Sequence, residues 1–252
     1  MNTRYSVNLA KQKMLKGELA VGVTCGMGSP LIAEALSFAG FDFVLVDTQH
    51  GAWTDESASH AFRSIDLGQA TPMARVKWND LGAIGRLLDR GALGIVVPMV
   101  NSAEQAAAAA FAMRYPPRGG RSSGGIPPRF GTDYDRWIND EVFLAVQIET
   151  VQAVENAEAI LAVEGVDGCW IGPADLAKSM GIDRNTDEGF QAHRAMIAKV
   201  AEACRKTGKI AGISGDVDIS FWKNNGFRFV TASYDGGLML EGAKQVFKIL
   251  GN

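Results

Sequence analysis

The sequence has few cysteines, few prolines and no long apolar run. Cys25, Cys169 and Cys204 are odd in number and far apart, which excludes a complete disulfide framework and a zinc-ligand spacing. Unpaired thiols of this kind suit a reducing compartment. The longest apolar run, Ala106–Met113, is far shorter than the roughly 20 residues that cross a bilayer. Residues 1–16 also lack the apolar stretch of a signal peptide, so we expect an unexported, cytoplasmic protein without a membrane partner.

The chain also lacks an excess of positive charge. Its 25 Lys and Arg residues are scattered and are outnumbered by 28 Asp and Glu, which gives a formal net charge of −3. No basic stripe is present to displace counterions from a phosphate backbone, so we expect no nucleic-acid partner. The length of 252 residues allows one large domain or two small ones.

Short β-rich runs alternate with longer stretches of helical apolar spacing. Several of the runs are almost continuously apolar, as parallel strands covered on both faces should be. The predicted strands are Leu19–Thr24, Phe41–Val46, Pro72–Trp78, Leu93–Val100, Val142–Ile148, Val166–Ile171, Lys209–Ser214 and Phe227–Ser233. The clearest helical patterns are Leu31–Phe38, Ile84–Leu88, Ala103–Met113, Val151–Leu161, Ala192–Cys204 and Leu238–Leu250.

Four glycines, Gly40, Gly91, Gly165 and Gly226, stand just before alternate predicted strands. Glycine at these joints is expected as the left-handed residue that ends a helix. Eight strand–helix units with this spacing favour a single (β/α)₈ TIM barrel over residues 1–252, of the α/β class. The competing open sheet normally has a glycine-rich turn after its first strand, and the only candidate, 26–30, lacks the third glycine.

One long segment, 115–141, interrupts the alternation and is rich in proline and glycine. Because strand–helix units continue on both sides, we interpret it as an extended loop of one domain rather than a linker. Its arginines Arg118, Arg121 and Arg129 could contact an anionic substrate or a neighbouring subunit. An ordinary solvated surface loop is an equally good interpretation of the sequence.

In a barrel, chemistry belongs at the carboxyl ends of the strands, and two acids stand at such ends. Glu149 follows the fifth predicted strand, on the same face as Gln147, and Asp175 follows the sixth. Two carboxylates that supply part of a coordination sphere suit Mg²⁺ or Mn²⁺. The structural alternative is that Glu149 caps a helix and Asp175 complements a helix dipole.

Other strand ends also carry polar groups. Arg75 on the third strand requires a carboxylate, from a substrate or from the barrel itself. His50 follows the second strand near Asp47, an arrangement typical of an oriented general base, although a surface histidine fits as well. Lys77 is a candidate Schiff-base lysine or an ordinary solvated charge. The seventh strand ends in Ser214, Gly215 and Asp216.

Taken in order, the segments DTQHG, ARVKWND, LLDRGALGIVVPMV, RYPPRGGR, VQIET and EGVDGCWIGPADLAKSMG resemble the HpcH/HpaI family of metal-dependent pyruvate aldolases. The resemblance runs from about Leu19 to near the C-terminus. It implies a modified TIM barrel, a homohexamer with the C-terminal helix exchanged between subunits, and a role in the catabolism of aromatic compounds. The implied reaction is reversible cleavage of a 4-hydroxy-2-oxo acid, of the heptanedioate or 2-keto-3-deoxy sugar acid type, to pyruvate and an aldehyde.

The resemblance also implies roles for residues that match the family's motifs. Glu149 and Asp175 would ligate a divalent ion (Mg²⁺, Mn²⁺ or Co²⁺), and Arg75 would contact the keto oxygen of pyruvate. Backbone amides near Gly172, Pro173 and Ala174 would hold the pyruvate carboxylate; Pro173 itself has no amide hydrogen. Gln147 would orient pyruvate or a water, and we add Ser214 to the predicted substrate-binding residues.

For proton transfer at the aldehyde oxygen, the resemblance implies His50, paired with Asp47 and with Asp89 from a neighbouring subunit. Gln49 stands where some members have Glu, which bears on the base that delivers the proton. The alternatives left open are a Schiff-base aldolase that uses Lys77, a relative that cleaves acyl-CoA esters, and a non-catalytic barrel that binds keto acids. The chain has no obvious extra segment for a CoA nucleotide.

Overall fold

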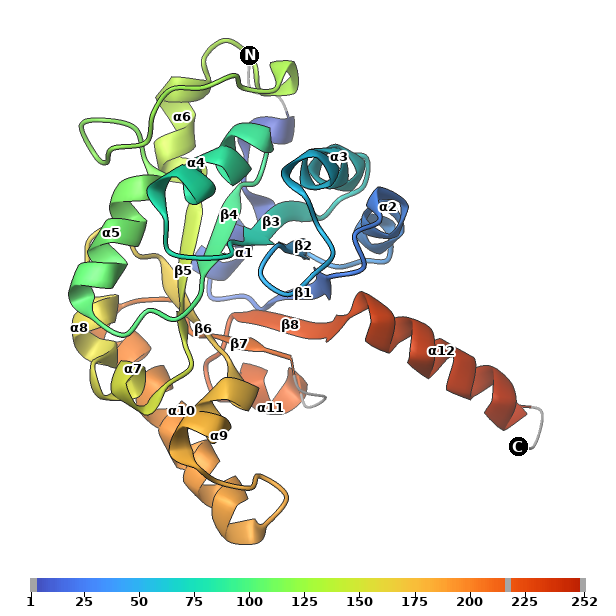
Figure 1. Cartoon of the computed structure of the whole chain (residues 1–252), viewed down its shortest axis with the longest axis vertical. Helices are drawn as coiled ribbons and strands as arrows, with labels where there is room; N and C mark the ends of the chain where they lie inside the picture. The colour runs from blue at the N-terminus through green and yellow to red at the C-terminus, as the bar shows by residue number, and fades with distance from the viewer. Residues whose placement is uncertain (1–3, 216–218, 250–252) are drawn as a thin grey trace.

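The computed structural model describes residues 4–215 and 219–249. Its centre is a closed barrel in which every strand runs parallel to its neighbours and β8 returns to β1 (Figure 1). This closure confirms the (β/α)₈ barrel and rules out the open sheet. Each predicted strand overlaps an observed one; the strands are β1 Ala20–Cys25, β2 Phe43–Asp47, β3 Thr71–Arg75, β4 Gly94–Val97, β5 Phe143–Ile148, β6 Gly168–Ile171, β7 Gly212–Ser214 and β8 Phe229–Tyr234.

Helices connect the strands and cover the outside of the barrel. The predicted helix Val151–Leu161 is divided at Asn156, whose side chain donates to the Asn101 carbonyl at 2.8 Å. The elements are η1 Arg4–Ser6, α1 Leu9–Leu15, α2 Pro30–Phe38, α3 Asp55–Ile65, α4 Leu81–Arg90, α5 Ala103–Met113, η2 Pro128–Phe130, α6 Tyr134–Glu141, α7 Val151–Glu155, α8 Ala157–Leu161, α9 Pro173–Met180, α10 Asp187–Thr207, α11 Ile219–Asn224 and α12 Asp235–Ile249. None of the helices within residues 4–215 and 219–249 is long and apolar enough to cross a membrane.

The four glycines predicted to end helices have positive φ values between 87° and 120°. Gly17 and Gly208, which precede β1 and β7, also have positive φ, at 79° and 68°. The left-handed joint therefore occurs before odd-numbered strands as well, and the alternation predicted from the sequence is incomplete.

Large side chains fill the inside of the barrel below its carboxyl-terminal rim. Phe229 stacks on Phe43 with ring centroids 4.7 Å apart and meets Phe143 edge-on at 5.1 Å. Gly22 makes room for this cluster, because a Cβ at that position would lie 2.2 Å from the Phe43 ring. Met14 of α1 closes the cluster from the amino-terminal end of the strands. The inside of the barrel is thus a packed core here, and a ligand site is expected at its other end.

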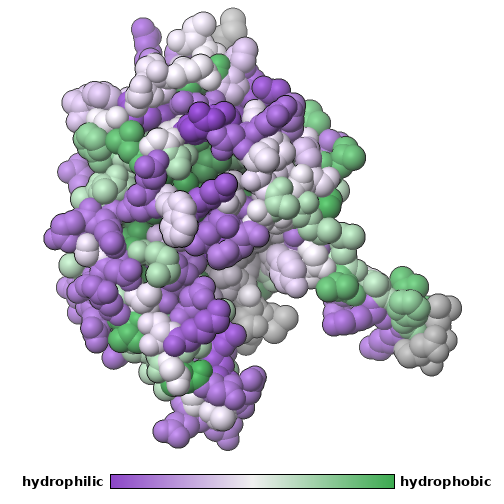
Figure 2. Space-filling view, viewed as in Figure 1, coloured by the Kyte–Doolittle hydropathy of each residue, from purple (hydrophilic) through white to green (hydrophobic). Residues whose placement is uncertain are grey.

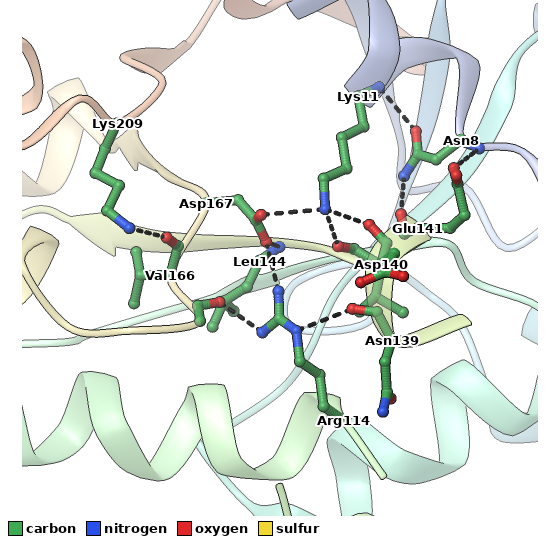
Figure 3. A network of polar contacts seen from close by, with 12 residues as sticks. Asn8, Lys11, Arg114, Asn139, Asp140, Glu141, Leu144, Val166, Asp167 and Lys209 are labelled. Carbon is green, nitrogen blue, oxygen red and sulfur yellow. Dashed lines mark hydrogen bonds and ion pairs between the residues drawn. The ribbon is translucent and has the colours of Figure 1, made fainter. Parts of the chain in front are cut away.

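A polar network fastens α1 across the amino-terminal end of the barrel (Figure 3). Lys11 donates to the carbonyls of Asp140 and Val142 at 2.7 and 2.8 Å and forms an ion pair with Asp167 at 3.1 Å. Arg114, directly after α5, pairs with the other oxygen of Asp167 at 3.2 Å. These bonds satisfy charges that would otherwise be buried without partners, so this end of the barrel has a structural role.

The 115–141 segment connects α5 to β5 and contains η2 and α6, so only part of it is the predicted loop. It lies at this same closed end, opposite the rim where catalysis is expected. Its arginines pair within the chain, Arg118 with Asp140, Arg121 with Asp89 at 2.7 Å, and Arg129 with Asp66. The expectation that they bind a substrate of this subunit is therefore wrong, because their charges are already matched and they lie at the wrong end. A contact with a neighbouring subunit stays a prediction.

The two kinds of loop arginine should differ in their effect on stability. Arg121 is 1% exposed and stacks on Tyr115 at 4.6 Å, so Arg121→Ala leaves Asp89 without its buried partner. We expect a loss of about 3 kcal/mol in the free energy of unfolding, measured by urea denaturation. Arg118→Ala is the control, because its pair with Asp140 is exposed and should contribute less than about 0.5 kcal/mol. Equal losses in the two variants would contradict this assignment.

Candidate active site

A cavity of about 520 Å³ opens at the carboxyl ends of the strands, and we call it the rim cavity. It has the position that catalytic sites occupy in TIM barrels. Of the residues predicted from the sequence, those that line it are Asp47, His50, Arg75, Gln147, Gly172, Pro173, Ala174, Asp175 and Ser214. Glu149 lies directly behind this lining, in contact with Gln147 and Gly172. Asp216 lies outside the described residues.

Arg75 is held by a bidentate ion pair with Asp47. The two residues are opposite each other in the register of β2 and β3, and the guanidinium Nε donates to Asp47 Oδ1 at 2.9 Å while Nη2 donates to Oδ2. Arg75 is 9% exposed and lies over the Trp170 ring at 5.3 Å from its centroid. Its Nη1 has no partner among the described residues and is available to an oxygen in the rim cavity.

The expected pairing of Asp47 with the His50 ring is wrong. Both Asp47 oxygens bind Arg75, and Oδ1 also accepts the backbone amides of Gln49 and His50 at 3.1 and 3.3 Å. The reason is the strand register, which brings the guanidinium directly against the carboxylate. The exposed His50 ring lines the rim cavity and forms no hydrogen bond within the described residues. Asp47 therefore positions Arg75 and the loop after β2.

Asp89 does not reach the rim cavity of its own subunit. It lies near the end of α4, at the closed end of the barrel, where it binds Arg121. Because helices run antiparallel to the strands in this fold, the end of α4 and the rim are on opposite sides of the subunit. Only a neighbouring copy could bring Asp89 to His50, and that part of the expectation stays a prediction.

Glu149 is buried and fixed by two donors. The Met99 amide donates to Glu149 Oε1 at 2.8 Å, and Gln147 Nε2 donates to Oε2. Met99 has a φ of 57°, a conformation that non-glycine residues rarely adopt and that often marks a functional site. Burial raises the pKa of Glu149, and the negative charge of Asp175 adds to the increase. A cation beside Glu149 would remove this cost of a buried negative charge.

Asp175 lies in the first turn of α9 and pairs with the exposed Lys178 at 3.1 Å. Gly172 separates it from Glu149, and a Cβ there would lie 2.8 Å from Glu149 Oε2 and 2.9 Å from Gln147 Nε2. A side chain at this position would therefore have to displace the ends of the Glu149 and Gln147 side chains. Two carboxylates of neighbouring strands, with space in front of them, fit a hard divalent cation that takes its other ligands from water and substrate. Among the described residues, no group of three or more His, Cys, Asp or Glu side chains forms a closed metal site.

The structure corrects one detail of the predicted carboxylate site. The Gly172 amide donates to the Ile148 carbonyl at 3.1 Å, so it is not available to a ligand. Pro173 has no amide hydrogen. The Ala174 amide lies in the first turn of α9, where intrahelical acceptors are lacking, and is the donor that remains.

Sequence reasoning missed several residues that line the rim cavity, including Asp235 and Trp170, and proposed one residue that does not line it. Asp235, directly after β8, is 3% exposed and accepts the amides of Gly26 and Met27, both at 2.8 Å. Trp170, two residues before Gly172, forms the wall beside Arg75. A search for polar residues at the end of the eighth strand would have found Asp235. Following the alternation of side chains along the sixth strand would have found Trp170. Lys77 lies beyond the end of β3, exposed and outside the cavity lining.

The raised pKa of Glu149 makes a prediction about stability. Glu149→Gln removes the buried charge while Gln147 can rotate so that its unpartnered Oε1 accepts from the new amide. With a chelator present at pH 7, we expect the melting temperature to rise by about 2–4 °C, which corresponds to roughly 1 kcal/mol. Because the folded-state pKa is raised, this difference should be complete above that pKa and vanish as the pH falls below the ordinary value of 4.5. Calorimetry with exposed Glu155→Gln as the control would measure it; a fall in melting temperature for Glu149→Gln alone would contradict it.

Comparisons with known proteins agree on one family. The model of the HpcH/HpaI aldolase/citrate lyase family matches residues 25–241. A hydroxypyruvate/pyruvate aldolase of Cupriavidus necator is 38% identical over 81% of this chain and 77% of its own length. A 4-hydroxy-2-oxo-heptane-1,7-dioate aldolase of Klebsiella pneumoniae is 35% identical over 94% and 91%. A solved HpcH/HpaI family protein of Burkholderia cenocepacia superimposes with a TM-score of 0.89 at 28% identity, covering 98% of this chain and 100% of its own. The chain therefore belongs to the HpcH/HpaI aldolase/citrate lyase family.

Proposed function

We propose that the protein is a divalent-metal-dependent aldolase that reversibly cleaves a 4-hydroxy-2-oxo acid to pyruvate and an aldehyde. The observation that carries the proposal is the convergence of Arg75 with the carboxylates Glu149 and Asp175 at one end of the barrel. The names of the two aldolase relatives support the same reaction class. The first name gives only hydroxypyruvate and pyruvate, whereas the second gives a substrate that carries a second carboxylate.

Glu149 and Asp175 would hold the divalent ion, of which Mg²⁺, Mn²⁺ and Co²⁺ suit carboxylate oxygens. When bound, the ion supplies positive charge beside the keto acid and lowers the energy of the enolate. Met99 and Gln147 keep the Glu149 carboxylate oriented, so little reorganisation is needed when a cation and a substrate arrive.

The other roles follow from groups with free hydrogen-bonding capacity. Arg75, immobilised by Asp47, would donate from Nη1 to the keto oxygen as negative charge develops there. The Ala174 amide would bind the pyruvate carboxylate, and Ser214 would add a hydroxyl to the same cavity. His50, which is exposed and lines the same cavity, would take the proton of the 4-hydroxyl in cleavage and return it in aldol addition.

The described residues that line the rim cavity include no lysine for the alternative mechanism through a Schiff base. Lys77 is exposed beyond β3 and does not line the rim cavity. A buried, desolvated lysine would be needed for its amine to be nucleophilic near neutral pH. The position of Lys77 thus favours the reaction that uses Arg75 and a metal.

We further propose that the chain folds as a single domain and assembles as the predicted homohexamer. Neighbouring subunits would exchange α12. α12 projects away from the barrel (Figure 1), and hydrophobic side chains gather along it (Figure 2). Its exposed apolar residues include Leu240, Phe247 and Ile249, which are 63%, 56% and 84% exposed. Leu31 and Phe38 of α2 are also exposed, at 77% and 65%, and offer a second apolar surface for burial between copies. A cytoplasmic location and a catabolic role agree with the three unpaired thiols and the reaction class.

The roles of Arg75 and His50 can be separated by two assays. Arg75→Ala should reduce the exchange of pyruvate C3 protons with solvent at least about 100-fold, because the enolate loses its donor. His50→Ala should retain that exchange and slow aldol cleavage by about 100-fold or more. Exchange is measured by NMR in deuterated buffer that contains Mg²⁺ and no Mn²⁺. Cleavage is measured by coupled detection of pyruvate.

Two controls accompany these variants. Arg75→Lys keeps a cation beside Asp47 and tests whether lost activity reflects the unpaired carboxylate, with circular dichroism as a check of folding. Lys77→Ala should leave both assays unchanged. The reverse pattern for Arg75 and His50, or cleavage that survives exhaustive chelation, would contradict the proposal.

The exposed apolar face of α12 predicts a defined change in assembly. Phe247→Glu places a charge in the surface that would be buried between copies, so light scattering should show dissociation to smaller species. Gln245→Glu adds the same charge on the same helix without removing an apolar side chain, and it should assemble like the unaltered protein. Identical masses for Phe247→Glu and the unaltered protein would count against helix exchange.

A further inference from the structure

Two of the three cysteines meet in the core, away from the site at the rim. Cys169 lies on β6, and Cys204 lies near the end of α10, 35 positions later in the chain. Both side chains are buried, and their Sγ atoms are 3.5 Å apart. The packing of α10 on β6 therefore brings together two thiols that are far apart in the sequence.

The contact is close enough for the two thiols to become a disulfide. The sulfur atoms would have to approach by about 1.5 Å, which side-chain rotation and a small shift of α10 can supply. Cys204 borders a cavity of about 540 Å³ between α10 and α11, which we call the side cavity; its lining includes Ile197, Ala211 and Phe227. Cys204 thus has free space on one side, where a fully packed core would resist the movement.

The side cavity also leads a small reagent to the thiol pair. Cys204 lines the cavity, and Cys169 lies directly behind it. Hydrogen peroxide is uncharged and little larger than water, so a space of this volume admits it. Thiols react with peroxide as thiolates. The hydrogen bond between the two thiols lowers the pKa of Cys169 and raises the pKa of Cys204, so the pair loses its first proton at Cys169.

Cys25 provides an internal comparison within the same chain. It is also buried, at the end of β1, but no other cysteine of the described residues contacts it. Burial raises the pKa of its thiol, and the negative charge of Asp235 adds to the increase. Cys25 therefore stays protonated and has no second thiol with which to form a bond.

We propose that Cys169 and Cys204 form a peroxide-reactive dithiol, which a hydroperoxide converts to a disulfide between β6 and α10. In the first step a thiolate attacks the O–O bond, one oxygen stays on sulfur as a sulfenic acid, and the other leaves as water with the proton that the thiol released. In the second step the remaining thiol attacks the sulfenic sulfur, so the S–S bond forms, the S–O bond breaks and a second water leaves. Two thiols lose two electrons and the peroxide gains two, and the product is the same whichever thiol reacts first.

The disulfide should join two elements of the barrel wall without closing the rim cavity. Side chains alternate along β6, so Cys169 packs in the cluster outside the barrel while Trp170 packs inside and lines the rim cavity. The second thiol also has a protective effect, because it captures the sulfenic acid before more peroxide makes the irreversible sulfinic acid. A charged sulfinate in this apolar cluster would be costly to bury.

The test exposes the folded, reduced protein to a modest molar excess of hydrogen peroxide. The protein is then unfolded in the presence of a maleimide, which labels each remaining thiol before thiols and disulfides can exchange. Intact mass spectrometry should show that the labelled thiols fall from three to one. Digestion should give a peptide pair that joins Cys169 to Cys204 and that dithiothreitol separates. The oxidised protein should also melt about 5 °C higher, because the bond closes a long loop.

Two variants isolate the contribution of the second thiol. In Cys204→Ala, peroxide should add about 32 or 48 Da at Cys169, as sulfinic or sulfonic acid, and dithiothreitol should not reverse the change. Cys25→Ala is the matched control, because it also removes a buried thiol, and it should form the disulfide as the unaltered protein does. Circular dichroism before treatment checks folding, and the peptide map of the unaltered protein is decisive even where a variant does not fold.

Three results would overturn the inference. They are three free thiols after peroxide treatment, a bond that involves Cys25 or a second chain, and a sulfinic acid at Cys169 or Cys204 in the unaltered protein. None of these measurements uses aldolase activity, so the inference can fail while the proposed function stands, and the reverse also holds.

Discussion

Closure of eight parallel strands into one ring is the constraint on which the other features of this molecule depend. Because every strand runs in the same direction, all carboxyl ends meet at one rim and all amino ends at the other. The amino-terminal end is sealed by α1 and by the network around Lys11 and Asp167, and large aromatic rings fill the middle. Space for a ligand remains at the carboxyl-terminal rim, where the polar side chains of strands far apart in sequence converge.

The rim places charges where burial is costly and uses neighbouring groups to reduce that cost. Arg75 and Asp47 neutralise each other through the β2–β3 register, and one guanidinium nitrogen is left for a ligand. Glu149 retains an unfavourable negative charge despite two donors, as the increase in its pKa indicates. Such residual instability is typical of functional sites, where a bound cation or substrate supplies the missing interaction. The left-handed backbone conformation of Met99, whose amide donates to Glu149, is a second unfavourable feature of this site.

Much of the fold could be predicted from the sequence because its signals are local. Short β-rich runs, several of them almost continuously apolar, marked the eight strands, and glycines at 40, 91, 165 and 226 marked the ends of helices. The strand-end rule also located Arg75, Glu149 and Asp175. Asp235 was missed because the rule was not extended to the eighth strand, and Trp170 was missed because the alternation of side chains was not followed along the sixth. The partner of Asp47 was misassigned, because proximity in sequence suggested His50 whereas register across strands selected Arg75.

The sequence by itself determined the strand order, the fold class, the family and the principal residues at the rim, since these depend on periodicity and on motifs within single segments. Tertiary structure alone decided which charges are already paired. It placed the 115–141 arginines at the closed end with their own carboxylates, and it brought the thiols of Cys169 and Cys204 into contact. The physical reason is that ion pairing and hydrogen bonding depend on distances between segments, which barrel closure and register determine and local patterns do not encode.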